Sequence, residues 1–138
     1  MISLEKILNS KKLFLISGPC VIENKSATLE IASRIKDITT ELDIPFIFKA
    51  SYQKANRSRI DSFTGPGIED GLNTLKTIKD KLSIPVTSDI HSLEDIKKAS
   101  NILDIIQIPA FLCRQTDLLV AAAKTNKIIN VKKGQFLA

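Results

Sequence analysis

The sequence predicts an α/β fold with about five parallel strands in a single domain, residues 1–138. Short apolar runs typical of buried strands alternate with longer segments whose apolar residues recur at helical spacing. A weak internal repeat supports this order, because residues 38–45 and 78–85 share Ile, Leu, Ile and Pro and each joins a helical stripe to a strand. Alternating strands and helices form parallel sheets with right-handed crossovers. A chain of 138 residues fits one domain.

The first third of the chain contains two predicted strands and one predicted helix. Residues 1–12 indicate a short helical or irregular lead-in. The apolar run 13–17 predicts a strand buried on both faces, which Gly18-Pro19 ends. Ser26 is the predicted N-cap of the next helix. Its apolar stripe, with spacings of four, three and four, comprises Ile31, Ile35, Ile38 and Leu42. The second strand is predicted at 46–49.

The middle third begins after a basic loop, with Gly65-Pro66-Gly67 as a strong turn signal. A second apolar stripe comprises Ile68, Leu72, Leu75, Ile78 and Leu82. Residues 85–89 predict a third, weaker strand. Ser92 with Asp95 resembles a capping box, which predicts a short helix over 93–99.

The last third predicts a strand at 105–108, a helix over 115–124 and a strand at 128–132. Unusual polar residues stand at or just after the carboxyl ends of the predicted strands: Cys20, Lys49, Asp89, Gln107, Phe111, Arg114, Lys132 and Lys133. In a parallel α/β barrel this edge carries the active site, and in an open doubly wound sheet ligands bind at the same edge. These side chains are therefore predicted to converge on one face.

The composition favours a small anionic ligand over nucleic acid. The chain has 20 basic and 15 acidic residues, and its aromatic residues are six Phe and one Tyr, with no Trp. Base stacking on a protein surface needs more aromatic side chains than this, so no nucleic-acid partner is predicted. No apolar run is long enough to span a bilayer, and no secretory signal precedes the first strand. A cytoplasmic location with free thiols and no membrane partner is the expectation.

The stretch from Phe48 to Ser58 is the most informative part of the sequence. A short apolar strand runs directly into a loop of lysines, arginine, asparagine and serines. Arginine offers a planar fork of donors and lysine a point charge, and both suit phosphate oxygens. A solvated basic loop is the alternative interpretation, because exposed charge is common. Asp89 and the cysteines also have purely structural interpretations. Asp89 would cap a helix, and the cysteines would be small buried apolar residues. His91 is predicted to be a solvated loop residue rather than a metal ligand.

With these motifs in order, the sequence resembles the 3-deoxy-D-manno-octulosonate 8-phosphate synthase family, and specifically its N-terminal half. The matching segments are Gly18 to Glu23, Phe48 to Ser51, Lys54 to Ser58, Asp89 to His91, Gln107 to Leu119 and Val131 to Ala138. The resemblance implies the N-terminal part of a (β/α)8 TIM barrel with about five strands. It also implies a transferase of lipopolysaccharide (KDO) biosynthesis that condenses phosphoenolpyruvate with D-arabinose 5-phosphate. The related 3-deoxy-arabino-heptulosonate 7-phosphate synthases normally carry a Lys-Pro-Arg-Thr-type loop, so Lys54 to Ser58 favours the arabinose 5-phosphate enzyme.

The resemblance also implies roles for individual residues. Arabinose 5-phosphate would be held by Asn56, with Arg57 and Ser58 on its phosphate, and Lys49 and Asp89 would contact the sugar. The surroundings of phosphoenolpyruvate would be Lys54, Ala110, Arg114 and Lys132, and the pocket would be lined by Gln107, Pro109 and Phe111. Lys54, Lys132 and Asp89 are the implied catalytic residues.

The family has a metal-dependent branch with cysteine at the position of Cys20, so the resemblance implies a divalent transition metal, whose borderline-soft character suits a thiolate. Its other ligands come from the second half of the barrel, and His91 does not match the ligand histidine. A homo-oligomer is the implied assembly.

A complete barrel needs about 250 residues. We therefore expect this chain alone to bind its substrates poorly and to turn over little, or to pair with a C-terminal half. Two alternatives remain from the sequence: a non-catalytic phosphosugar-binding or interaction module, and a heptulosonate-type enzyme using erythrose 4-phosphate.

Overall fold

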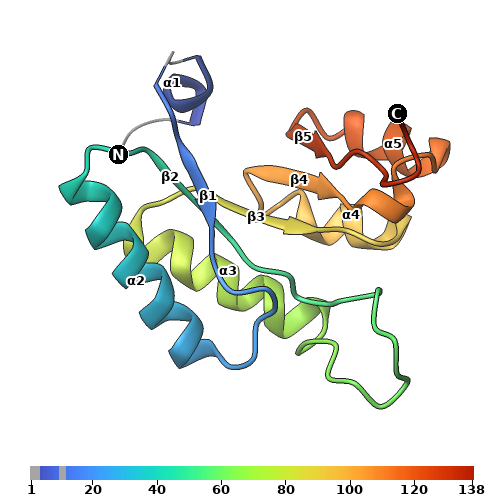
Figure 1. Ribbon diagram of the computed structural model, residues 1–138, viewed down its shortest axis with the longest axis horizontal. Coiled ribbons are helices and arrows are strands. Elements are labelled where there is room, and N and C mark those ends of the chain that lie inside the picture. Colours follow the sequence, from blue (N-terminus) through green and yellow to red (C-terminus); the bar gives the residue numbers. More distant parts are fainter. Residues whose placement is uncertain (1–3, 10–11) are drawn as a thin grey trace.

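The computed structural model describes residues 4–9 and 12–138, and within these residues five parallel strands form one sheet whose spatial order follows the chain, β1-β2-β3-β4-β5 (Figure 1). The strands are β1 (Leu15–Ser17), β2 (Phe46–Lys49), β3 (Val86–Asp89), β4 (Ile105–Ile108) and β5 (Ile128–Val131). The helices are α1 (Leu4–Asn9), α2 (Lys25–Glu41), α3 (Ile68–Leu82), α4 (Leu93–Ala99) and α5 (Thr116–Ala123), with a 3-10 turn η1 (Ala110–Leu112).

This strand order decides between the two architectures that the sequence left open. A doubly wound sheet reverses its strand order at a switch point, whereas a barrel adds each new strand on the same side of the last one. The described strands never reverse. The fold is therefore part of a (β/α) barrel, as predicted.

Most element boundaries agree with the sequence predictions. The strands 46–49 and 105–108 and the helix 93–99 are confirmed at both ends, and the others differ by one or two residues. The lead-in is helical over Leu4–Asn9, and residues 1–3 and 10–11 lie outside the described residues.

The predicted N-cap of α2 is wrong by two residues. Asn24, not Ser26, is the cap, because Asn24 has extended backbone angles and its Oδ1 accepts the N–H of Ala27 at 2.9 Å. Ser26 lies inside the helix, where its hydroxyl donates to the same Asn24 Oδ1 at 3.0 Å. A cap must precede the helical dihedrals, and Ser26 already has them.

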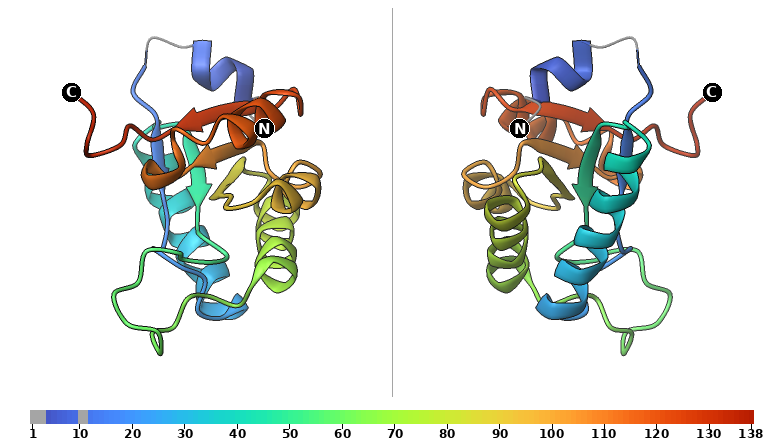
Figure 2. Two further views of the ribbon diagram at one scale, coloured as in Figure 1. Left: turned by 90° about the vertical axis from the view of Figure 1, so that its right-hand side faces the viewer. Right: turned by 90° about the vertical axis from the view of Figure 1, so that its left-hand side faces the viewer.

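The two faces of the sheet are covered differently. Along β2, Phe46 and Phe48 pack into the main core beneath the helices, while Ile47 points to the other face. There Ile47 and Ile105 form a small cluster with Ile7 of α1. Figure 2 shows α1 at one end of the strands and the loop that follows β2 at the other. The small cluster with α1 thus lies toward the amino ends of the strands. The polar side chains lie at the opposite, carboxyl ends.

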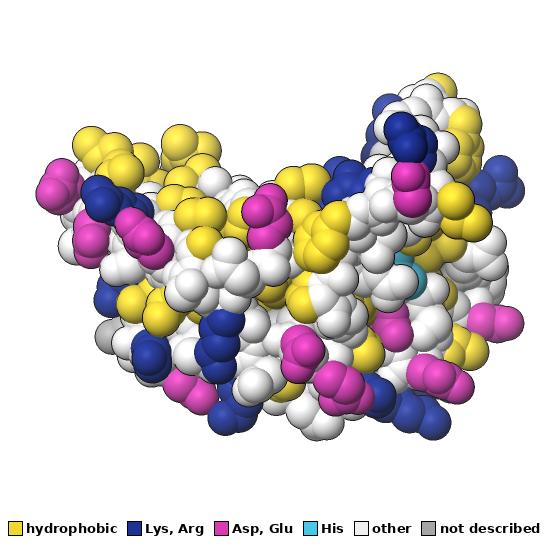
Figure 3. Space-filling view, turned by 90° about the horizontal axis from the view of Figure 1, so that it is seen from below, with side chains coloured by type: hydrophobic (Ala, Val, Ile, Leu, Met, Phe, Trp, Pro, Cys, Tyr) yellow, Lys and Arg dark blue, Asp and Glu magenta, His cyan; other side chains and the backbone are white. Residues whose placement is uncertain are grey.

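The apolar stripe predicted on α2 exists, but most of it does not face the core. Ile35 is partly buried against the core, whereas Ile31, Ile38 and Leu42 are exposed, and Figure 3 shows hydrophobic side chains gathered over this helix. The face that packs closely consists of smaller residues: Thr28, Ala32 and Thr39. Small side chains let the helix approach its neighbours, and the buried hydroxyls are satisfied by bonding back to helical carbonyl groups.

Among the described residues, none of the helices combines the length and apolar character that crossing a membrane requires.

Candidate active site at the carboxyl ends of the strands

A cavity of about 430 Å³ lies where the carboxyl ends of the strands meet. Its lining residues come from the loop after β2, from the ends of β2, β3 and β4, and from the segments after β4 and β5. They are Lys49, Lys54, Ala55, Asn56, Asp89, His91, Gln107, Pro109, Ala110, Phe111, Lys132 and Gln135. Among the described residues that line it, three are lysines and one is a carboxylate, so the cavity is cationic.

A glycine brings the end of β1 close to this cavity. A Cβ atom at Gly18 would lie 2.0 Å from the carbonyl oxygen of Lys49, which is too close for any other residue. The Gly18-Pro19 break therefore does more than end a strand. It lets the chain after β1 pass directly against the backbone that carries Lys49.

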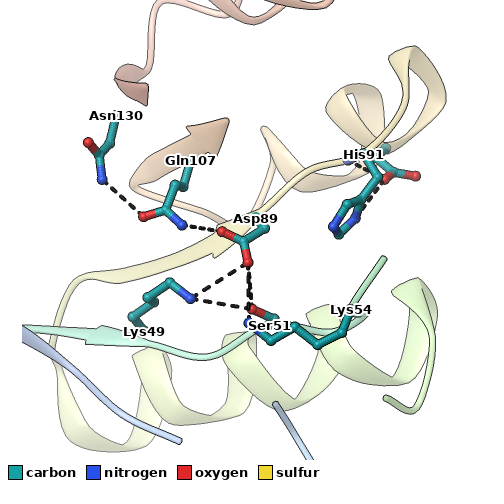
Figure 4. Close-up of polar contacts among 8 residues, drawn as sticks. Lys49, Ser51, Lys54, Asp89, His91, Gln107 and Asn130 are labelled. Carbon is teal, nitrogen blue, oxygen red and sulfur yellow. Dashed lines mark hydrogen bonds and ion pairs between the residues drawn. The ribbon is translucent and has the colours of Figure 1, made fainter. Parts of the chain in front are cut away.

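The floor of the site is a row of polar side chains, one from each of four neighbouring segments (Figure 4). Asp89 pairs with Gln107 in the register of β3 and β4, and Gln107 pairs with Asn130 in that of β4 and β5. Ser51 continues the row beyond the end of β2. Residues at matching positions of parallel strands point to the same face, so all four side chains meet.

Hydrogen bonds join this row from end to end. Asn130 Nδ2 donates to Gln107 Oε1 at 3.0 Å, and Gln107 Nε2 donates to Asp89 Oδ1. On the other side, the Ser51 hydroxyl donates to Asp89 Oδ2 at 2.7 Å. Asp89 is thus held by a neutral donor on each oxygen.

Two lysines share the same carboxylate. Lys49 Nζ lies 3.7 Å and Lys54 Nζ 3.6 Å from Asp89 Oδ2, and Lys49 also donates to Ser51 Oγ at 3.3 Å. Burial alone would raise the pKa of Asp89, but the two lysines and the hydrogen bonds from Ser51 and Gln107 lower it. Burial lowers the pKa of Lys49, and the nearby Asp89 opposes this only in part. Asp89 is therefore ionised at neutral pH, a fixed anion between two cations.

A second group of contacts supports one wall of the cavity. The ring of His91 lies between Tyr52, edge-on at 5.9 Å, and Phe111, stacked at 6.5 Å between centroids. The Tyr52 hydroxyl donates to Asp95 Oδ2 at 2.8 Å, and the backbone N–H of His91 donates to the same oxygen at 2.9 Å. Asp95 thereby ties the start of α4 to the loop after β2. The predicted capping box is only half formed: the Ser92 hydroxyl accepts the N–H of Asp95, but the Asp95 carboxylate accepts the backbone N–H of His91 rather than that of Ser92.

The structure brings most of the predicted site residues together. Those in the cavity wall are Lys49, Lys54, Asn56, Asp89, Gln107, Pro109, Ala110, Phe111 and Lys132. Four lie outside the lining: Cys20, Arg57, Ser58 and Arg114. All four are exposed, and Arg57 donates from Nε to the carbonyl of Phe63 at 3.2 Å.

Three residues of the site were missed or misjudged from the sequence. His91 was predicted to be a solvated loop residue, and this is wrong, because its side chain is 15% exposed and lines the cavity. Ser51 and Asn130 were given no role. Strand alternation could have found both, since Ser51 is two residues beyond Lys49 and Asn130 two before Lys132.

The described residues contain no group of three or more His, Cys, Asp or Glu side chains that could hold a metal ion. Cys20 is an exposed free thiol, and Cys113 is half-buried. Of the metal ligands that the family resemblance implies, the described part of the chain holds Cys20 alone.

A partial barrel with a cationic cavity at the carboxyl ends of its strands defines the class as a (β/α)-barrel protein with a site for anionic ligands. Comparison with known proteins then narrows the class. The chain matches the DAHP synthetase I family over residues 3–138 and belongs to that family.

Several similar proteins carry the name 2-dehydro-3-deoxyphosphooctonate aldolase. The chain is 58% identical to one from Geotalea uraniireducens over 133 residues, 96% of this chain and 49% of the relative. It is 59% identical to one from Geobacter metallireducens over the same shares. It is 61% identical to one from Desulfatibacillum aliphaticivorans over 125 residues, 91% of this chain and 46% of the relative. The chain thus spans about half the length of the curated relatives it matches.

Proposed function

We propose that this chain carries the first part of an active site for condensing phosphoenolpyruvate with D-arabinose 5-phosphate. The products would be 3-deoxy-D-manno-octulosonate 8-phosphate and inorganic phosphate. C3 of phosphoenolpyruvate forms the new bond to the sugar aldehyde, water adds at C2, and phosphate leaves by cleavage of its C–O bond. The name shared by the similar proteins supports this reaction.

The observation that carries the proposal is the charge of the cavity. Three lysines line it against one carboxylate, and that carboxylate already has hydrogen-bond donors on both of its oxygens. Both proposed substrates are phosphate esters, and phosphoenolpyruvate has a carboxylate as well. Fixed cations can stabilise charge that develops in the reaction without first reorganising.

The family resemblance implies separate roles for the cations. Lys54 and Lys132 would offset the charge of phosphoenolpyruvate, while Lys49 and Asp89 would meet the sugar. Asn56, at the cavity wall, precedes Arg57 and Ser58, which would hold the sugar phosphate. Arg57 donates from Nε to the backbone carbonyl of Phe63, which leaves its two Nη groups free to bind a phosphate.

Calorimetric titration of the 138-residue chain with each substrate tests the proposal. Both should bind, weakly because the chain carries only part of the barrel, and Lys54→Met should weaken phosphoenolpyruvate binding by about a further 10- to 100-fold, the range of a charge-assisted hydrogen bond. Lys76→Met, on the exposed surface of α3, is the matched control and should change nothing. The proposal fails if the wild-type chain binds neither substrate.

Phosphate release measured with arabinose 5-phosphate or erythrose 4-phosphate then identifies the acceptor. Release with erythrose 4-phosphate alone would assign the chain to the heptulosonate-forming activity instead.

We also propose that Cys20 supplies one thiolate to a divalent transition metal whose other ligands come from outside the described residues. Its exposed position just after β1, where Gly18 brings the chain against the backbone of Lys49, supports this. Such a metal, when bound, would act as a Lewis acid at the site. Cobalt titration of the chain paired with the C-terminal half of the Geotalea relative should give a thiolate-to-metal absorption band that Cys20→Ser abolishes and Cys113→Ser keeps. A band that survives Cys20→Ser would refute the assignment.

We further propose that the site is completed by the second half of a barrel. β1 is an edge strand, and the exposed stripe of α2 follows it in the chain, so both could be covered by added strands and helices. Co-expression with the C-terminal half of the Geotalea relative should raise phosphate release above that of the chain alone. No co-purification of the two polypeptides would contradict this.

A further inference from the structure

His91 is the only histidine of the chain, and both its ring and its backbone make contacts in the cavity wall. Tyr52 and Phe111 contact its ring from two directions, and its backbone N–H is bonded to Asp95. Figure 4 shows it beyond the end of β3, its ring on the side of the site where Lys54 lies. The imidazole therefore has one defined orientation in the cavity wall.

The surroundings of the ring favour the neutral imidazole. Burial lowers the pKa of His91, and Lys54 lowers it further, while Asp89 and Asp95 oppose the shift without reversing it. Tyr52 is un-ionised, because burial and the hydrogen bond to Asp95 raise its pKa. Phe111 carries no charge. A neutral imidazole has one N–H donor and one lone-pair acceptor.

The position of Asp95 decides which ring nitrogen carries the proton. Nδ1 is buried, makes no hydrogen bond, and lies 3.9 Å from Asp95 Oδ2. That distance is too long for a hydrogen bond, but a lone pair on Nδ1 would face the negative oxygen in a poorly solvated place. A proton on Nδ1 removes this repulsion. Nε2 is then left with the lone pair.

Unused acceptors are scarce in this cavity. Lysine ammonium groups only donate. Each oxygen of Asp89 already accepts one hydrogen bond, as does the side-chain oxygen of Gln107, so these acceptors have only their remaining lone pairs to offer. Apart from the exposed amides of Asn56 and Gln135, the described lining side chains offer one uncommitted acceptor nitrogen, Nε2 of His91.

We propose that His91, as the Nδ1-protonated tautomer, binds a hydroxyl group of the acceptor sugar through Nε2. Such an acceptor selects for O–H groups, because it has no proton to offer to phosphate or carboxylate oxygens. A polyol aldehyde has several hydroxyl donors, whereas phosphoenolpyruvate has none on its carbon skeleton. The inference rests on the proposed function and assigns His91 to the sugar side of that site.

Nitrogen-detected NMR of the ring tests the first part directly, because a single histidine needs no assignment. The wild-type chain should show the Nδ1–H tautomer, with titration below the ordinary value of 6.5. A proton on Nε2 overturns the proposal whether or not any substrate binds. Adding arabinose 5-phosphate should shift the Nε2 resonance, and inorganic phosphate alone should not.

Two variants separate hydrogen bonding from packing. His91→Phe keeps an aromatic ring between Tyr52 and Phe111 but removes the acceptor, while His91→Gln keeps an acceptor and removes the ring. We expect His91→Phe to weaken arabinose 5-phosphate binding by about three- to tenfold, the range of one neutral hydrogen bond, and to leave phosphoenolpyruvate binding unchanged. His91→Gln should recover most of the affinity. The reverse order, with His91→Phe behaving as wild type, would show that the ring only packs and would overturn the inference.

These outcomes can be told apart from failure of the proposed function. If arabinose 5-phosphate moves backbone amides around the cavity but not the His91 ring, the function stands and the role of His91 is refuted. If neither substrate moves any amide of the wild-type chain, the proposed function falls and the assignment to a sugar hydroxyl falls with it.

Discussion

Asp89→Asn should destabilise the fold, because Asp89 is the acceptor on which the donors of the candidate site converge. The change keeps the size and shape of the side chain, removes its charge, and turns one oxygen into an NH2 group. Lys49 and Lys54 then lose the anion that lies between them. In addition, either Ser51 or Gln107 meets a donor where it had an acceptor.

The size of the effect follows from the distances. At 3.6 and 3.7 Å, each lysine is attracted to Asp89 by about 4–5 kcal/mol at an effective dielectric constant of about 20. Desolvation of the three groups and the repulsion between the lysines offset most of this gain. Removing one partner of a buried ion pair costs about 3–5 kcal/mol, and partial exposure of the lysines reduces the cost here to about 2–3 kcal/mol.

Urea denaturation followed by circular dichroism measures this loss as a shift in midpoint at constant slope. Asp43→Asn is the control: the Lys12–Asp43 pair is shorter, at 2.9 Å, but both side chains are exposed, so the midpoint should not move. Adding Lys54→Met to Asp89→Asn should recover about 1–2 kcal/mol, since the two sites are coupled. If Asp89→Asn unfolds at the wild-type midpoint, the carboxylate does not organise the site and the reasoning is refuted.

The pH dependence of the stability difference between wild type and Asp89→Asn is a second test of the role of the carboxylate. Because the pKa of Asp89 is lowered in the folded state, the unfolded chain binds the proton more readily, and stability due to Asp89 increases with pH. The difference in unfolding free energy between wild type and Asp89→Asn should be at its full size above pH 3.8, the ordinary pKa of aspartate. It should close as the pH falls through the lowered native pKa. A gap that persists unchanged in acid would mean that the effect is steric.

Three further predictions concern the fold. Gly71→Ala should lower stability by about 1–3 kcal/mol despite the better helix propensity of alanine, because its Cβ would lie 2.2 Å from Cβ of Tyr52; an unchanged thermal midpoint would contradict the packing of α3 on this tyrosine. Asn24→Ala should cost about 1 kcal/mol through loss of the α2 cap, while Ser26→Ala stays near neutral; equal losses in chemical denaturation would argue for the cap that the sequence suggested. Ile38→Ser should change the unfolding free energy by less than about 0.5 kcal/mol, because the side chain is 56% exposed; a loss above about 1.5 kcal/mol would show that this stripe is covered in solution.

The sequence predicted the order of elements well because each strand is bounded by a strong local signal. Prolines, the Gly65-Pro66-Gly67 turn and a Ser92 cap fix where elements start, and these depend only on neighbouring residues. The identity of the packed face of α2 is different. Helical spacing shows which residues share a face, but which face meets the sheet depends on how closely the helix must approach. Ala32 at that contact, rather than Ile38, could not be chosen from periodicity alone.

The site was predictable where a residue's role follows from its place at a strand end. Lys49, Asp89 and Gln107 were found in this way, and all three meet in the cavity. His91 was misjudged because its burial comes from Tyr52 and Phe111, which lie 39 and 20 residues away along the chain. A contact of that kind has no signature in local sequence.

The polar row and the two lysines have different roles in the candidate site. Lys49 and Lys54 form ion pairs with Asp89 at 3.6–3.7 Å, beyond ordinary hydrogen-bond length, so the attraction does not use up their N–H donors. Ser51 and Gln107 supply the close donors instead. Because these neutral groups satisfy the buried anion, both lysines can turn toward an anionic ligand without leaving Asp89 unpaired. The row thus holds the negative charge in place, and the cations above it remain available for substrate.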